Sequence, residues 1–167
     1  MSETGIENEN KIVMHFQEAL QRVGIAEELK SELGVEYACL RSMMLEPQNT
    51  TMWNALALVY MMSDRVVEAE EAIERSLDID TSNVWTWTLW GDLLLREDRL
   101  VEAQRVFRMA VELDPMNVQA IRNLAVLYAE RGAHTEAIDL FQILLQFEPN
   151  DQDIWDAYST CLGKMRK

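Results

Sequence analysis

Residues 84–117 read VWTWTLWGDLLLREDRLVEAQRVFRMAVELDPMN, and this stretch decides the fold because its pattern returns on both sides of it. Its last four residues, Asp-Pro-Met-Asn, recur with a spacing of 34 residues. The other copies are Glu-Pro-Gln-Asn at 46–49, Asp-Thr-Ser-Asn at 80–83 and, in part, Glu-Pro-Asn-Asp at 148–151. A fixed period of this length is the sequence signature of a repeat protein.

Each period contains the pattern of two helices. In the first half of the quoted stretch, apolar or small residues recur at helical spacing, as in Trp87, Gly91 and Leu94. A polar turn at 97–99 follows, and proline ends the second helix because it cannot continue the hydrogen-bonded ladder. Small residues such as Gly91 recur where the two helices should cross closely. On this pattern the tryptophans expected in the core are Trp53, Trp87, Trp90 and Trp155.

The pattern Trp-x-x-Leu-Ala/Gly-x-x-Tyr, followed by Ala-x-x-x-Phe and Pro, resembles the tetratricopeptide repeat (TPR). The resemblance implies an all-α fold, a right-handed superhelical solenoid of 34-residue helix-turn-helix repeats. The expected division of the chain is a disordered acidic tail at 1–10, a degenerate N-terminal repeat or capping helices at 11–49, repeats at 50–83, 84–117 and 118–151, and a C-terminal capping helix at 152–167.

Composition narrows the classes of partner. The chain has 167 residues, with 15 basic and 29 acidic side chains and a net charge of −14, which argues against binding nucleic acid through a basic face. No apolar run approaches the roughly 20 residues that span a bilayer, so membrane insertion is not expected. The acidic excess is concentrated in residues 1–82, which favours a protein partner with a basic flank.

The sequence carries no pattern typical of a catalytic or metal-binding site. His15 and His134 lie far apart and lack the spacing that places two ligands on one helical face. The acidic run at 68–74 is typical of a solvated helix start. We therefore expect no enzyme activity, no metal and no cofactor. Cys39 and Cys161 form no ligand spacing, and the N-terminus lacks the features of a secretory signal, so we expect free thiols in the cytoplasm.

The TPR resemblance implies that the first helices of the repeats line a concave groove in which ligands bind. Helical spacing assigns thirteen residues to this surface, which we call the groove face: Asn54, Leu58, Met61, Met62, Trp85, Thr88, Leu89, Asp92, Arg96, Gln119, Arg122, Asn123 and Val126. Many of them are apolar, and methionine gives an adaptable surface. This composition favours docking of an amphipathic helix or an extended apolar peptide, with Trp85 as its anchor.

Some TPR proteins hold the acidic C-terminus of heat-shock chaperones through a basic clamp on this face. The corresponding positions are Asn54, Leu58, Leu89, Gln119 and Asn123, and none is lysine or arginine. Without a cation, the terminal carboxylate would lose its charge-assisted hydrogen bonds, so we do not expect this activity.

Three hypotheses for the function follow. The first is a non-catalytic protein–protein interaction module (an adaptor, an assembly factor or a chaperone-like scaffold) that binds a peptide or helix of a partner in the groove. The second is a self-associating structural subunit, a homo-oligomer whose groove is filled by its own N-terminal helix at 11–23. The third is a regulatory subunit of an enzyme.

Overall fold

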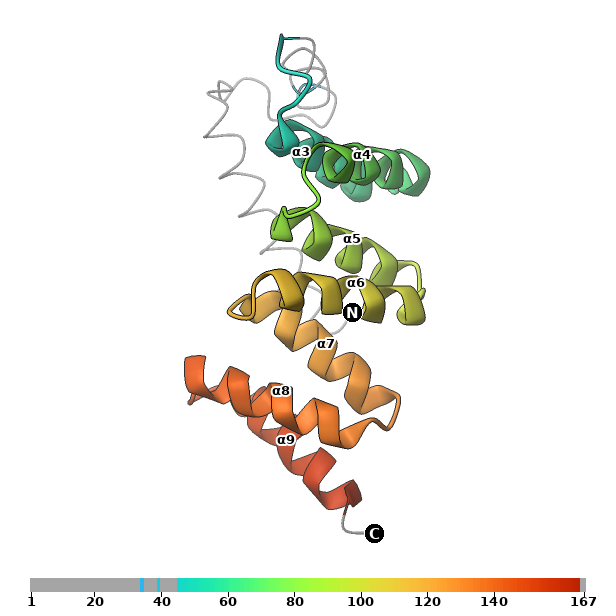
Figure 1. Cartoon of the computed structure of the whole chain (residues 1–167). Helices are drawn as coiled ribbons and strands as arrows, with labels where there is room; N and C mark the ends of the chain where they lie inside the picture. The colour runs from blue at the N-terminus through green and yellow to red at the C-terminus, as the bar shows by residue number, and fades with distance from the viewer. Residues whose placement is uncertain (1–33, 35–38, 40–44, 166–167) are drawn as a thin grey trace. The chain divides into compact units, whose positions relative to one another are not determined.

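The computed structural model describes residues 34, 39 and 45–165 of the chain (Figure 1). Residues 50–165 form seven α-helices and contain no β-strand. The expected acidic tail at 1–10, the helix at 11–23 and most of the expected capping helices before residue 50 lie outside the described residues.

The helices are, in chain order, α3 (Thr50–Met62), α4 (Val66–Ile79), α5 (Val84–Arg96), α6 (Leu100–Leu113), α7 (Val118–Glu130), α8 (His134–Phe147) and α9 (Gln152–Met165). The helices α3, α5, α7 and α9 begin at equivalent positions of the 34-residue period, and so do α4, α6 and α8. The all-α helical repeat fold expected from the sequence is therefore confirmed.

The last residue of each four-residue motif caps the helix that follows. Asn49 Oδ1 accepts a hydrogen bond of 3.1 Å from the Thr51 N–H, and Asn117 Oδ1 accepts one of 2.9 Å from the Ala120 N–H. The same role is filled by Asn83 toward Thr86 and by Asp151 toward Ile154. A capping oxygen satisfies one of the N–H groups that a helix start leaves unpaired, so the motif fixes where each first helix begins.

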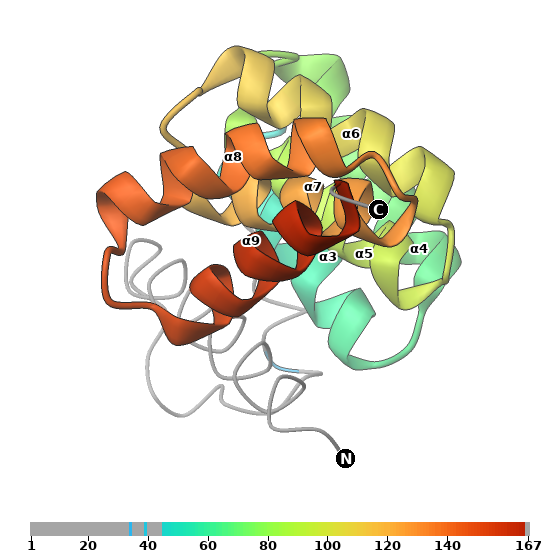
Figure 2. The ribbon, with the colours of Figure 1, turned by 90° about the horizontal axis from the view of Figure 1, so that it is seen from below.

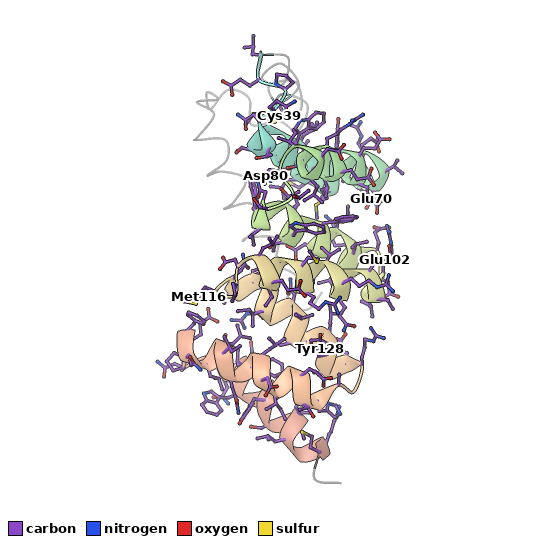
Figure 3. All side chains as sticks on the ribbon, in the orientation of Figure 1. Cys39, Glu70, Asp80, Glu102, Met116 and Tyr128 are labelled. Atoms are coloured by element: carbon purple, nitrogen blue, oxygen red, sulfur yellow. The ribbon has the colours of Figure 1, made fainter. Side chains whose placement is uncertain are left out.

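The turn inside each hairpin needs one residue with a left-handed backbone. Asp64 and Asp98 have φ values of 58° and 57°, and Gly132 has 78° at the equivalent position. Aspartate and glycine tolerate this conformation better than other residues. After the second of these turns, Arg99 Nη2 pairs with Glu102 Oε2 at 2.7 Å, and Glu102 lies at the start of α6 (Figure 3). The polar turn therefore reverses the chain, and its arginine forms an ion pair with the glutamate in the first turn of the second helix.

The tryptophan column closes the turns between repeats. The indole N–H groups of Trp53, Trp87 and Trp155 donate to the carbonyl oxygen six residues earlier, at 3.2, 2.8 and 2.9 Å. Trp53 and Trp87 are half-buried, while Trp155 is 43% exposed, so its assignment to the core is wrong. In all three residues the polar edge of the indole satisfies a turn carbonyl, which keeps the ring at the rim of the hairpin, and the ring of Trp155 is the most exposed of the three.

The chain divides into two compact units between Leu89 and Trp90, inside α5. In the first unit, α3 and α4 pack against each other, with Leu56, Ala57, Ala69 and Ile73 among the buried residues. Alanine at the buried faces lets the two backbones approach closely.

In the second unit, α8 packs against both α7 and α9 (Figures 1 and 2). Its core cluster consists of Ile121, Ala125, Ala137, Ile138, Phe141, Leu144, Ile154 and Cys161. Gly91 of α5 lies against the Phe107 ring of α6, because a Cβ atom at position 91 would lie 2.5 Å from that ring. The expectation that a bulky side chain such as Phe107 fills the space beside the small residue is therefore confirmed.

Candidate protein-binding face

In the first unit, most of the groove face is removed from solvent. Asn54, Leu58, Met61, Thr88 and Leu89 are buried. The expectation that they form an accessible stripe is wrong in this conformation. Leu58, Met61 and Leu89 are buried because moving apolar surface out of water is favourable. Two more members have different surroundings, since Met62 is 42% exposed and Trp85 is half-buried. The assignment of all these residues to a partner-binding groove stays a prediction.

Asn54 is buried because it belongs to a polar trio with Ser76 and Thr86. Asn54 Nδ2 donates to Thr86 Oγ1 at 2.9 Å, and Ser76 Oγ lies 3.0 Å from the same oxygen. All three side chains are buried, and Ser76 Oγ has a second acceptor in the Thr50 carbonyl at 3.5 Å, so the trio satisfies its polar atoms within the fold. Sequence reasoning missed Ser76 and Thr86. The available signal was their polarity in repeat columns that hold Ala110, Leu144, Ala120 and Ile154 elsewhere.

In the second unit, Asp92 and Asn123 join two helices through the groove face. Asn123 Nδ2 of α7 donates to Asp92 Oδ1 of α5 at 2.9 Å. Burial raises the pKa of the Asp92 carboxyl to about 7, although the hydrogen bond from Asn123 acts in the opposite direction. A carboxyl with this pKa takes up and releases protons near neutral pH.

Arg122 is held by two acidic residues from the region between α8 and α9. Its Nη2 atom pairs with Glu148 Oε2 and lies 3.0 Å from Asp151 Oδ2. Burial alone would raise the pKa of Asp151, but hydrogen bonds from the Ile154 N–H and from Arg122 lower it overall. The positive charge of Arg122 is therefore already matched within the fold.

Val126 is the apolar member of the groove face in the second unit. It lies on α7, one turn after Arg122 and Asn123, and its side chain is 41% exposed. Gln119 is half-buried and Arg96 is exposed. The structure therefore places an exposed valine beside two polar side chains whose positions are fixed by hydrogen bonds and ion pairs.

The remaining candidates are the metal-binding groups, the two cysteines and the acidic residues at the start of α4. Within residues 34, 39 and 45–165, no group of three histidine, cysteine or acidic side chains could hold a metal ion. No helix in the same part of the chain is long and apolar enough to cross a membrane. Cys39 and Cys161 are free and buried, and burial raises the pKa of both thiols, that of Cys39 to about 11. Glu68 pairs with Arg65 at 2.9 Å.

Comparisons with known proteins agree with this architecture. Residues 9–154 match the family described as the cytochrome c-type biogenesis protein H TPR domain. No curated protein matches the sequence.

Several solved structures share the fold. The protein MamA superposes with a TM-score of 0.72 and 16% identity, over 90% of this chain and 82% of that one. For PilF of Pseudomonas aeruginosa the values are 0.69 and 19%, over 95% and 70%. The first TPR of Spaghetti (RPAP3), bound to an HSP90 peptide, gives 0.63 and 17%, over 72% and 98%. At these identities the likeness concerns the fold alone.

Proposed function

Because the chain belongs to the family of the cytochrome c-type biogenesis protein H TPR domain, we propose that it is a non-catalytic protein–protein interaction module. It acts as an adaptor, assembly factor or scaffold that binds an apolar or amphipathic segment of a partner on the groove face. One observation carries the proposal: Val126 is exposed beside Arg122 and Asn123, which are already held in place. An accessible apolar contact with fixed polar neighbours loses little side-chain entropy on binding.

The clamp positions of the groove face and the net charge of the chain indicate the chemistry of the partner. The RPAP3 domain was solved with an HSP90 peptide, SRMEEVD, which is acidic. In this chain the clamp positions carry no lysine or arginine, and Arg122 is paired with Glu148 and Asp151. An acidic peptide would therefore find no available cation at these positions. The net charge of −14 favours a partner with a basic flank instead.

The test compares two exposed valines. The partner is captured from native cell extract with the full chain, and the amounts retained by Val126→Glu and Val101→Glu are measured by quantitative mass spectrometry. Val101 lies on α6 and is 52% exposed, so the same substitution there is a matched control outside the groove face. We expect Val126→Glu to reduce capture at least tenfold and Val101→Glu to leave it unchanged. The opposite pattern would contradict binding at the groove face.

The second candidate is the self-associating subunit whose groove face is filled by its own residues 11–23. The burial of Leu58, Met61 and Leu89 favours it, since an open groove would leave these side chains accessible. Here Trp85 and Trp87 give the discriminating experiment. If the groove face binds a partner, Trp85→Ala should weaken binding at least about thirtyfold and hardly change Tm, while Trp87→Ala lowers Tm. If the chain fills its own groove, both substitutions should lower Tm alike.

A cytoplasmic location is part of the proposal. Two buried free thiols are compatible with a reducing compartment, where disulfides are rare. Fractionation of the native cells with an antibody to the chain tests it, and recovery in an oxidising compartment would overturn it.

A further inference from the structure

One helix of the first unit is buried on every side. All the residues of α3 from Asn54 to Met61 are buried. Eight consecutive residues make more than two turns of a helix, at about 3.6 residues per turn, so this part of α3 has no side that faces solvent. The first helix of an open repeat would instead keep its groove side accessible.

Repeat neighbours alone do not account for this burial. The repeat position of Leu58 is held in α7 by Val126, and the exposed fractions of the two side chains are 2% and 41%. In the second unit α7 packs against α6, α8 and α9, yet this position stays open. An additional segment therefore covers the groove side of α3, where Leu58 and Met61 lie.

The chain before α3 contains a stretch of the right length and pattern. Residues 11–23 carry apolar side chains at helical spacing, at Ile12, Val13, Phe16, Ala19, Leu20 and Val23. As a helix, these 13 residues would be about 20 Å long, which is also the length of the 13-residue α3. The first unit extends from Met1 to Leu89, so the stretch belongs to the unit that it would cover. The 21 residues between Val23 and Leu45 can span about 70 Å, so reach does not limit this contact.

Charge also favours this stretch as the cover. Residues 45–89 carry eight acidic and two basic side chains, whereas residues 11–23 carry two basic and one acidic. The two parts of the first unit therefore attract each other. A segment tethered to its own binding face also has an effective concentration on the order of millimolar, which favours it over the same segment of a second copy.

We propose that residues 11–23 lie as an amphipathic helix against Leu58 and Met61 on the groove face, and that a partner helix of the same apolar pattern binds by displacing them. The inference rests on the proposed function and names its regulation. The second candidate function needs a face that is permanently filled, whereas this cover exchanges with the partner. The apparent affinity of the partner is then reduced by the fraction of chains whose face is covered.

Three methionines of α3 report on the two sides of the helix. Met61 is 1% exposed, Met52 is 2% exposed and Met62 is 42% exposed. Met52 and Met61 are nine residues apart, which is about two and a half turns, so they lie on opposite sides of α3. Hydrogen peroxide oxidises accessible methionine to the sulfoxide, and peptide mass spectrometry of the full chain measures the rate at each position.

The deciding variant is Phe16→Asp, which places a charge in the apolar stripe of the segment. We expect oxidation of Met61 to become at least about tenfold faster, while the rates at Met52 and Met62 stay unchanged. The matched control is Gln21→Asp, which adds the same charge on the opposite side of the predicted helix. It should leave all three rates unchanged.

A fluorescent peptide with the sequence of residues 11–23 tests the exchange. It is titrated with the full chain and followed by anisotropy. The Phe16→Asp chain should bind it with a Kd of about 10–100 µM, and the natural chain should bind it at least about tenfold more weakly, because its own segment competes. Bound peptide should also restore slow oxidation of Met61 in the Phe16→Asp chain.

The outcomes separate the possible places of the segment. Slow oxidation of Met61 in Phe16→Asp overturns the proposal, and so does equal affinity of the two chains for the peptide. Faster oxidation of Met52 instead of Met61 makes the segment a cap at the end of the array. Protection of Met61 that is lost on dilution, together with a dimer in sedimentation, assigns the segment to a second copy. Either result overturns the proposal.

A milder variant keeps the test decisive if Phe16→Asp loses its cooperative melt. Leu20→Ala then takes its place, as a smaller change in the same stripe, and must give faster oxidation of Met61 with Met52 unchanged. The Val126 experiment can fail independently of these measurements. It scores a partner from cell extract at the second unit, whereas the oxidation rates and the peptide need only the chain itself.

Discussion

The polar trio of the first unit and the apolar packing of the second occupy the same positions of the repeat. Asn54, Ser76 and Thr86 are buried and hydrogen-bonded to one another. Two periods later the same positions hold Arg122, Leu144 and Ile154. Leu144 and Ile154 are buried in the apolar cluster, while Arg122 forms ion pairs with Glu148 and Asp151.

The difference shows that the repeat fixes backbone geometry but leaves the chemistry of each junction free. A buried polar trio is stable only when every member finds its partner, whereas an apolar pair needs only a matching shape. A hairpin stacked on the wrong neighbour would bury a hydroxyl or an amide against leucine or isoleucine without a hydrogen bond. Different junctions within one repeat array therefore favour a single order of stacking.

The largest expected effect concerns the packing of α5 against α6 inside one hairpin, which the repeat pattern fixes more strictly than the contacts between hairpins. Gly91→Leu places a branched side chain where even a Cβ atom would lie 2.5 Å from the Phe107 ring. We expect it to lower the free energy of unfolding by about 3 kcal/mol, measured by urea melts. An unchanged midpoint would mean that the α5–α6 crossing is not close.

A paired substitution provides the control for this prediction. Gly91→Ala combined with Phe107→Ile copies the Ala57 and Ile73 pair of the preceding hairpin, where both residues are buried. It should be more stable than Gly91→Ala alone, because isoleucine makes room for the added methyl group.

The next effect tests the junction itself. Thr86→Val replaces the hydroxyl with a methyl group of similar shape, so Asn54 and Ser76 lose the partner that they share. We expect it to lower the free energy of unfolding by about 2 kcal/mol. The triple variant Asn54→Thr, Ser76→Ala, Thr86→Ala introduces the residues that stand at the same positions one period later, which are Thr88, Ala110 and Ala120. Per residue changed it should cost less than Thr86→Val. Equal stability of Thr86→Val and the natural chain in urea melts would show that the trio contributes nothing.

The smallest effect concerns Asp92, whose pKa is raised by burial to about 7. The folded state then holds a proton that the unfolded chain releases near pH 4, so Asp92 lowers stability as pH rises from about 4 to 7. Asp92→Asn keeps an oxygen that can accept from Asn123 and removes the charge. We expect the variant to be about 1–2 kcal/mol more stable than the natural chain at pH 8 and equally stable at pH 4, by urea melts. A difference that does not depend on pH would contradict the assignment.

Periodicity was sufficient to predict the all-α repeat fold, because helix starts, caps and turns depend on local residues. Asn49 and Asn117, for example, cap the helix directly after them. Depth within the fold was harder to predict. Helical spacing places Leu58 and Val126 in the same repeat column, yet Leu58 is 2% exposed and Val126 is 41% exposed. A column fixes direction on a helix, whereas burial depends on what packs against that helix.

The repeat period could not predict the polar contacts of the candidate site either. Asn123 and Asp92 lie in different columns of successive repeats, and Arg122 finds its partners Glu148 and Asp151 in the region after α8. Such pairs depend on distances across helices, which a single sequence does not supply. Trp155 was wrongly assigned to the core because a repeat column does not fix burial. Ile121 stands in the same column and is fully buried, whereas Trp155 is 43% exposed.

The two buried cysteines give each unit its own internal reporter. Cys39 belongs to the first unit and Cys161 to the second. Because burial raises the pKa of both thiols, the reactive thiolate is scarce while the fold stays closed. A thiol reagent then modifies each cysteine mainly when its own unit opens. Labelling rates at the two positions consequently measure the opening free energy of one half of the chain independently of the other, without any engineered probe.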